Sequence, residues 1–201
     1  MDYGFDTVID RHGIGNVKYD LMEKNGYAPD TIPMWVADMD FPAPPEVRKR
    51  LVELSETGMY VYTFVDEEYE NAVIGWFSSR IGYRPEREWI KITPGVVFAI
   101  GTAIRALTSP GDGVLIQRPV YHPFERLVVA NGRKLVNNPL IYQNGKYSID
   151  FNDFEHKLKT ENVKLFILCS PHNPVGRVWS ADELKTLSGL CRIYGVTVIS
   201  D

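Results

Sequence analysis

The segment Ser170–Gly176, with the sequence SPHNPVG, combines a stiff backbone with polar side chains that can bind a ligand. It follows the apolar run Leu165–Cys169, which is typical of a strand buried on both faces of a parallel sheet. Two prolines bracket a His-Asn pair and keep the residues before them out of helical geometry. Open α/β sheets bind ligands at the carboxyl ends of their strands. We therefore interpret Asn173 as a fixed hydrogen-bonding amide, with an ordinary β-to-α connection as the alternative.

Three more expected strand ends carry unusual groups. Gly95, Val96 and Val97 stand at the start of an expected helix, where free N–H groups and the helix dipole favour an anion such as phosphate. Tyr121 lies on a loop between two prolines, where its ring could stack on a flat ligand or simply pack. Asp201 ends an apolar strand, and a buried carboxylate there needs a cationic partner from the protein or from a ligand.

Together these groups form an anion site, an aromatic surface, an amide and an acid. That set suits a flat heteroaromatic phosphate with a basic ring nitrogen, and pyridoxal phosphate has those features. No P-loop and no GxGxxG pattern occurs in the sequence, so nucleoside triphosphate and dinucleotide sites have no support.

The surrounding pattern alternates strands and helices. We expect helices at about 44–58, 67–80, 97–107, 124–132, 150–159 and 180–195, and strands at about 89–92, 114–116, 135–136, 165–169 and 196–201. Asn144-Gly145 predicts a hairpin turn, and Ser180 with Glu183 predicts a capping box. Residues 1–33 lack periodicity and resemble an extended arm. The pattern predicts an α/β fold, with a mostly parallel sheet covered by helices on both faces.

The composition narrows the class of protein. The chain has 201 residues and a net charge of −4, which argues against a nucleic-acid binder. No apolar run approaches the roughly 20 residues that span a membrane, and the first residues contain no apolar signal core. Cys169 and Cys191 lie in apolar surroundings, which predicts core thiols in a reducing cytoplasm.

Four motifs, SPHNPVGRVW, WVADMDFPAP, ITPGVV and PVY, resemble those of the fold-type I pyridoxal-phosphate enzymes. Within that group the chain is similar to the cystathionine β-lyase/cystalysin (MalY/PatB-type) C–S lyases. The resemblance implies an aspartate-aminotransferase-like fold and a homodimer. It also implies two regions, with residues 1–45 as an N-terminal arm and part of a small domain, and residues 46–201 as the first part of the cofactor-binding large domain.

The resemblance also implies roles for the strand-end residues. Gly95–Val97 would hold the cofactor phosphate, and Tyr121 would stack on the pyridine ring. Asn173 would hydrogen-bond the phenolic oxygen of the ring. Asp201 would pair with the protonated ring nitrogen and so keep the ring an electron sink.

Further roles follow for the N-terminal region. Val36 and Ala37 match a segment that lies beside the substrate carboxylate. Tyr62 matches a tyrosine that reaches the phosphate of the neighbouring subunit. That tyrosine usually follows a glycine in the family, but here it follows Val61, so Tyr60 is a competing candidate.

The family's Schiff-base lysine and its carboxylate-binding arginine match no position in this sequence. We therefore expect the chain to be about the first half of a longer enzyme. The resemblance implies β-elimination on cystathionine, cystine or other cysteine S-conjugates, giving a thiol, pyruvate and ammonia. The alternatives are an aminotransferase of class I/II, and a catalytically inactive or regulatory binding protein with the same fold. An unrelated α/β domain with coincidental motifs is a further alternative.

Overall fold

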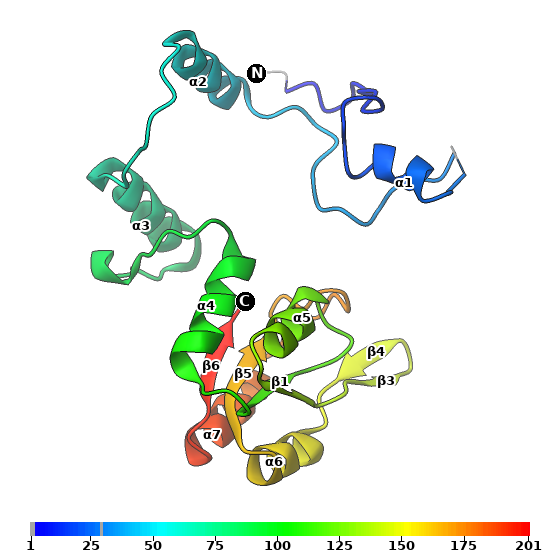
Figure 1. Cartoon of the computed structure of the whole chain (residues 1–201), viewed down its shortest axis with the longest axis vertical. Coiled ribbons are helices and arrows are strands. Elements are labelled where there is room, and N and C mark those ends of the chain that lie inside the picture. Colours follow the sequence, from blue (N-terminus) through cyan, green and yellow to red (C-terminus); the bar gives the residue numbers. More distant parts are fainter. Residues whose placement is uncertain (1–2, 29) are drawn as a thin grey trace. The chain divides into compact units, whose positions relative to one another are not determined.

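The chain divides into two compact units, Met1–Val65 and Asp66–Asp201. The computed structural model describes residues 3–28 and 30–201 (Figure 1). Residues 1, 2 and 29 of the expected N-terminal arm lie outside the described residues. The predicted division between residues 45 and 46 stays a prediction.

The first unit contains two helices joined by irregular segments. Helix α1 spans Asp20–Lys24, and α2 spans Pro45–Glu56. Helix α2 confirms the helix predicted at about 44–58. Proline is tolerated at its start because a first-turn residue has no intrahelical partner for its N–H. No residue of α2 is buried, and its apolar stripe is exposed. Periodicity thus identified the apolar face of the helix without revealing what covers it.

Helix α3, Glu67–Ile81, opens the second unit and confirms the helix predicted at 67–80. The side chain of Asp66 accepts a hydrogen bond of 2.9 Å from the backbone N–H of Tyr69, which caps the first turn. Gly82 ends the helix in the left-handed conformation, with φ of 67°.

The strand predicted at 89–92 was wrong. The structure has a 3-10 helix, η1, at Arg87–Trp89, and the backbone N–H of Ile90 donates to the carbonyl of Arg87 at 3.1 Å. The apolar run matched a buried strand in composition. A strand also needs a neighbour for its backbone groups, and none of the described strands pairs with this segment.

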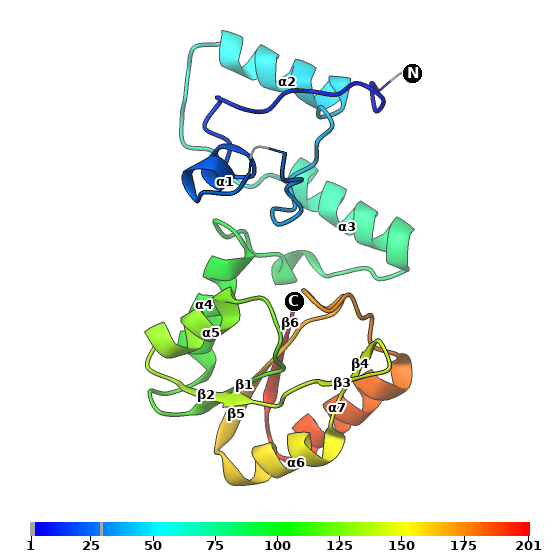
Figure 2. The same cartoon turned by 90° about the vertical axis from the view of Figure 1, so that its right-hand side faces the viewer.

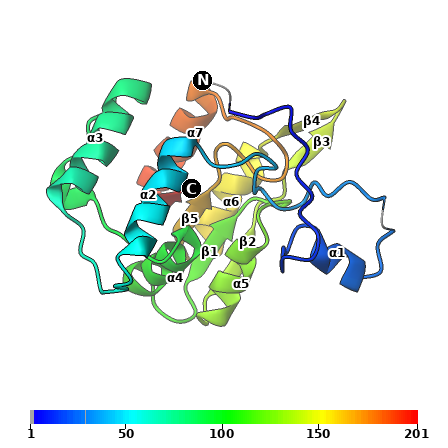
Figure 3. The same ribbon diagram turned by 90° about the horizontal axis from the view of Figure 1, so that it is seen from above.

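Four parallel strands form the sheet of the second unit in the order β2-β1-β5-β6, and Figure 3 labels the first three of them. They are β1 at Gly113–Ile116, β2 at Lys134–Asn137, β5 at Val163–Leu168 and β6 at Thr197–Ser200. The helices that connect or precede them are α4 at Val96–Leu107, α5 at Pro123–Ala130, α6 at Phe151–Thr160 and α7 at Ala181–Ile193. No helix among the described residues is long and apolar enough to cross a membrane.

Helices cover both faces of this sheet, as predicted (Figure 2). Val114 and Leu165 pack with residues of α4 and α5 on one face. Leu115 and Phe166 pack with residues of α6 and α7 on the other. Successive strand residues point to opposite faces, so each strand contributes to both apolar clusters. The core therefore lies in two layers, one on each side of the sheet, and both predicted core thiols, Cys169 and Cys191, are buried there.

Strand β6 departs from the buried pattern that its sequence predicted. It is an outermost strand of the sheet, and its residue Val198 is 39% exposed. Its apolar residues match those of a central strand. In this chain, however, only β5 pairs with it among the described strands.

Local turn and capping signals were read correctly. Strands β3, Ile141–Gln143, and β4, Lys146–Ser148, form an antiparallel hairpin across Asn144 and Gly145. Both turn residues have positive φ, 51° and 76°, as a two-residue hairpin turn of this sequence requires. The predicted capping box of α7 and the Asp150 cap of α6 are also present.

Candidate functional site

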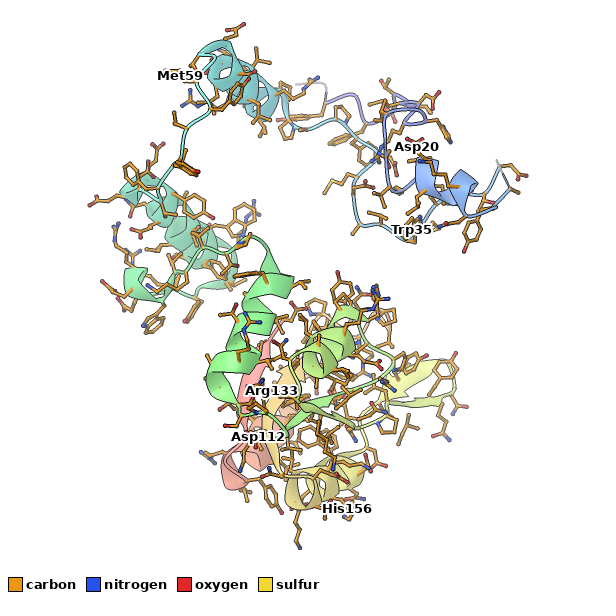
Figure 4. All side chains as sticks on the ribbon, viewed as in Figure 1. Asp20, Trp35, Met59, Asp112, Arg133 and His156 are labelled. Atoms are coloured by element: carbon orange, nitrogen blue, oxygen red, sulfur yellow. The ribbon has the colours of Figure 1, made fainter. Side chains whose placement is uncertain are left out.

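The four groups singled out in the sequence lie at the end of the sheet where the parallel strands terminate, which we call the sheet edge, although only three of them follow a strand. Tyr121 follows β1, Asn173 follows β5 and Asp201 follows β6, and these strands run parallel. Helix α4 precedes β1 and runs back along the sheet, so its first turn reaches the same edge (Figures 1 and 2). The opposite edge is marked by Asp112 and Arg133, which precede β1 and β2 (Figure 4).

The first turn of α4 is open to an anion. Gly95 occupies the N-cap position with φ of 99°, and no side chain caps the helix within the described residues. A Cβ built on Gly95 would meet no atom within 4 Å, so the space above this backbone is free. The N–H groups at the start of a helix have no intrahelical partner. The turn can therefore offer the backbone N–H groups of Val96 and Val97 to a phosphate.

Tyr121 is half-buried against α5. Its ring meets that of Phe124 edge-on, with centroids 5.7 Å apart and an interplanar angle of 88°. Phe124 is fully buried, so the core holds the Tyr121 ring at the sheet edge. A ring fixed in this way can stack on a flat ligand at low entropic cost.

Asn173 lies on a loop whose backbone is cross-linked. The N–H of His172 donates to the carbonyl of Arg177 at 2.7 Å, and the N–H of Gly176 donates back to the carbonyl of His172 at 2.8 Å. The backbone N–H of Asn173 points to the sulfur of Cys169 at 3.4 Å. The side chain of Asn173 is exposed. The loop thus fixes the backbone of Asn173 and leaves its amide group available to a ligand.

A salt bridge and an aromatic ring hold the far end of this loop. Arg177 makes a two-pronged ion pair with Glu183 on α7, at 2.8 and 2.9 Å. Its guanidinium also lies over the ring of Trp179, 4.8 Å from the centroid. The indole N–H of Trp179 donates to the carbonyl of Cys169 at 3.0 Å. These contacts tie the loop to the end of β5 and to the first turn of α7.

Asp201 is joined to the neighbouring strand end through its backbone. Its N–H donates to the carbonyl of Leu168 at 2.9 Å, and its carbonyl accepts from the N–H of Ser170 at 2.9 Å. The expectation of a buried carboxylate was wrong, because Asp201 follows the outermost strand β6 and is exposed. No ion pair to its side chain occurs among the residues that the structure describes. The carboxylate is free to pair with a cationic group of a ligand.

The other predicted site residues lie in the first unit and are not placed relative to this edge. Val36 is half-buried and Ala37 is exposed. Tyr62 is fully exposed, at 106% of the reference area. The hydroxyl of Tyr60 lies 3.1 Å from that of Ser55 on α2. Both tyrosines are thus exposed, and the choice between them stays open.

A charged cluster that the sequence analysis missed fixes the segment around Val36 and Ala37. Asp40 accepts hydrogen bonds from Lys18 at 2.8 Å, Tyr19 at 2.7 Å and Arg11 at 2.7 Å. These donors hold the pKa of Asp40 well below its usual value, with the Lys18 hydrogen bond as the largest cause. The partners are 21 to 29 residues from Asp40 in sequence, so spacing gave no signal.

Related contacts complete the cluster. The ammonium group of Lys18 also donates to the carbonyl of Asp38 at 3.0 Å, and Arg11 donates to the carboxylate of Asp38 at 2.8 Å. The indole of Trp35 donates to the carbonyl of Lys18 at 3.2 Å. Trp35 is labelled in Figure 4 within this unit. Residues 11–19 therefore hold both ends of the acidic WVADMD segment, at Trp35 and at Asp38 and Asp40.

The groups at the sheet edge fit a flat aromatic phosphate. The open first turn of α4 suits the phosphate, and Tyr121 suits the ring. The carboxylate of Asp201, which has no ion-pair partner within the described residues, suits a protonated ring nitrogen, and the exposed amide of Asn173 suits a ring oxygen. No cluster of His, Cys, Asp and Glu among the described residues could hold a metal ion. Lys164, on β5, and Lys185, on α7, are both exposed.

Comparison with known families and proteins identifies the family of the chain. The model of the family described as aminotransferase class I and II matches residues 29–201. The chain is 46% identical over 197 residues to cystathionine beta-lyase PatB of Bacillus subtilis (strain 168). That alignment covers 98% of this chain and 51% of the PatB sequence. The chain thus spans about half the length of the curated relatives that it matches.

Solved structures give the same result. Cystalysin from Treponema denticola, whose structure contains pyridoxal 5'-phosphate, matches with a TM-score of 0.92 and 38% identity, over 100% of this chain and 52% of cystalysin. The PLP-bound C-S lyase from Staphylococcus hominis matches with a TM-score of 0.90 and 36% identity, over 100% of this chain and 51% of that lyase. These matches confirm the predicted resemblance and the fold class.

Proposed function

The chain belongs to the aminotransferase class I and II family, and we propose from that premise that it is part of a pyridoxal-phosphate-dependent C–S β-lyase. The observation that carries the proposal is the set of four complementary groups at one sheet edge: the open first turn of α4, Tyr121, Asn173 and Asp201. Support for the lyase activity comes from the names of the similar proteins, a cystathionine beta-lyase and a C-S lyase.

The residues of the sheet edge would hold the cofactor. The N–H groups of Val96 and Val97, beside Gly95, would bind its phosphate, and the ring of Tyr121 would lie against its pyridine ring. Asn173 would donate from its amide to the phenolic oxygen. When bound, pyridoxal phosphate supplies an electron sink for the bonds at the substrate's α-carbon.

Asp201 would hold a proton at the ring nitrogen. An ionised carboxylate favours the protonated form of a nearby base, because the opposite charges attract. Val36 and Ala37 would orient the carboxylate of the substrate, and the cluster around Asp40 would fix their segment. In the overall reaction a cysteine S-conjugate and water give a thiol, pyruvate and ammonia. Cystathionine, cystine and other S-conjugates are the proposed substrates.

We also propose a homodimer in the cytoplasm. The full exposure of Tyr62 leaves its hydroxyl available to the phosphate of a second subunit, with Tyr60 as the alternative. The two cysteines are free and buried, which suits a reducing compartment.

An aminotransferase is the second candidate function, because the same four groups would serve it equally. These contacts hold the cofactor and set its electronic state, and they do not choose the reaction. The family itself includes aminotransferases by description. A binding protein without catalytic activity is the third candidate.

One experiment separates these candidates. The protein expressed from its complete gene is titrated with pyridoxal phosphate, and the visible absorption band is recorded. Cystathionine is then added, without and with a keto acid, and pyruvate and thiol are measured. The lyase proposal predicts a visible band, and pyruvate and thiol release without a keto acid. Turnover that requires a keto acid and releases no thiol would indicate an aminotransferase. A protein that never acquires the band would leave the binding role.

A further inference from the structure

The imidazole ring of His172, in the loop that carries Asn173, is buried, and neither of its nitrogens is in hydrogen-bond geometry with a partner among the described residues. The residue is 3% exposed. The ring meets Trp179 edge-on, with centroids 5.6 Å apart and an interplanar angle of 86°. Buried polar groups are nearly always hydrogen-bonded, so an unpartnered buried imidazole calls for an explanation.

Gln117 is a buried polar residue on the neighbouring loop, the one that follows β1 and carries Tyr121. It follows β1, and the register of β1 with β5 places it about level with Leu168, just before the His172 loop. Gln117 is 2% exposed, and its amide nitrogen donates to Asn138 at 2.9 Å. Its side-chain oxygen has no partner within the described part of the chain. Two incompletely satisfied side chains thus come from the two loops that carry Tyr121 and Asn173.

The surroundings of His172 favour a neutral ring. Burial lowers the pKa of His172 below its usual value of 6.5, and the nearby backbone of Gln117 offsets part of this effect although it is not in hydrogen-bond geometry with the ring. A neutral imidazole keeps one N–H donor and one acceptor. A small adjustment of the ring would therefore allow it to hydrogen-bond to the Gln117 loop as donor or acceptor.

His172 also controls the backbone on which Asn173 stands. Its N–H and its carbonyl make the two hydrogen bonds, to Arg177 and from Gly176, that close the loop. A shift of its ring against Trp179 would move the adjacent residue. The side chain of Asn173 is exposed, and within the described residues no hydrogen bond of its amide resists such a movement.

We propose that His172 is a positioning residue for the cofactor: its buried ring, seated on Trp179 and facing the Gln117 loop, sets the position from which Asn173 reaches the ligand. This inference rests on the proposed function, since it assigns a role in cofactor binding to a residue behind the site. His172 itself touches no ligand and takes no part in proton transfer.

The test is a double-mutant cycle on cofactor binding in the protein from the complete gene. The variants are His172→Phe, Asn173→Ala and the double variant, and the readouts are the dissociation constant for pyridoxal phosphate and the position of the visible band. Phenylalanine keeps the edge contact with Trp179 and removes the ring nitrogens. His156→Phe, on the exposed surface of α6 (Figure 4), is the matched control.

We expect His172→Phe to raise the dissociation constant about tenfold and to shift the band, while His156→Phe leaves both unchanged. In the Asn173→Ala background the same substitution should have little further effect, because its route to the cofactor is gone. An unchanged dissociation constant and spectrum in His172→Phe would overturn the inference, and so would an equal effect in both backgrounds.

Two further outcomes are distinguishable. If His172→Phe does not accumulate as folded protein, His172→Gln goes through the same cycle, and again only an effect that depends on Asn173 supports the inference. If the parent protein binds no pyridoxal phosphate, the proposed function itself fails. A parent that binds the cofactor beside a silent His172 variant defeats only the positioning role.

Discussion

The backbone N–H of Ser170 donates a hydrogen bond of 2.9 Å to the carbonyl oxygen of Asp201. With the return bond from Asp201 to the carbonyl of Leu168, also 2.9 Å, it continues the pairing of β5 and β6 beyond both strands. The loop that presents Asn173 starts at Ser170, so this pair of bonds fixes the amide and the carboxylate on a common backbone frame. A ligand that touches both would meet a rigid site.

Replacing Asp201 with asparagine should lower kcat of the lyase reaction about 100-fold. The substitution keeps the shape and the backbone hydrogen bonds of the residue and removes the charge that, in the proposed site, would hold a proton on the cofactor ring. Thiol release under saturating substrate measures the effect. Asp182→Asn, an exposed carboxylate on α7, is the control and should retain full activity. Equal activity of the two variants would contradict the role of Asp201.

Tyr121→Ala should weaken cofactor binding about tenfold, while Tyr121→Phe should stay within about threefold of the parent. The ring, and not the hydroxyl, makes the proposed stacking contact, and Phe124 would still support a phenylalanine ring. Fluorescence titration with pyridoxal phosphate measures both constants. Tyr142→Ala, at an exposed position of β3, serves as control. A loss of binding in Tyr121→Phe as large as that in Tyr121→Ala would rule out stacking as the main role.

Lys18→Met should raise KM for the amino-acid substrate about tenfold and change the affinity for pyridoxal phosphate little. Lys18 binds Asp38 and Asp40, and its loss would loosen the segment that contains Val36 and Ala37. Steady-state kinetics and cofactor titration separate the two effects. Lys49→Met removes an exposed lysine of α2 with a 3.9 Å contact to Glu53 and should behave as the parent. A tenfold loss of affinity for pyridoxal phosphate with an unchanged KM for the substrate would disprove this role.

Phe166→Ala should lower the free energy of unfolding by about 3–5 kcal/mol. Phe166 on β5 is fully buried and meets Phe154 of α6 edge-on at 5.0 Å between centroids. The truncation removes this contact and leaves a cavity between sheet and helix. Urea unfolding of the protein from the complete gene gives the value. Val129→Ala, at an exposed position of α5, should cost less than about 1 kcal/mol.

Protonation of His172 should destabilise the fold as the pH falls. Burial lowers its pKa in the folded state, so below about 6.5 the unfolded chain binds a proton that the folded chain does not. The stability is therefore complete above this usual value and declines as the pH falls from it toward the folded-state pKa. Thermal unfolding of the parent and His172→Phe from pH 7.5 to 5 measures the difference. Parallel profiles of the two proteins would refute the prediction.

Much of the fold of the second unit follows from local signals in the sequence. Capping groups such as Ser180 with Glu183, and the turn Asn144-Gly145, act within a few residues, so their structure could be predicted. The apolar run Leu165–Cys169 identified the central strand because burial on both faces leaves no polar position.

The errors concern interactions with partners that sequence does not specify. The run from Trp89 to Ile92 had strand composition but has no strand beside it among the described residues. Asp201 was expected to be buried, and it is exposed because β6 is an outermost strand of the sheet. The salt bridges of Asp40 join segments more than 20 residues apart, and no periodic pattern relates them.

A crystal structure of the protein from the complete gene with pyridoxal phosphate tests the central claim most directly. We predict the phosphate on the backbone N–H groups of Val96 and Val97, and the carboxylate of Asp201 within about 3 Å of the ring nitrogen. The amide of Asn173 should lie within hydrogen-bonding distance of the phenolic oxygen. A cofactor bound elsewhere, or bound here with Asp201 turned away from the ring nitrogen, would contradict the account.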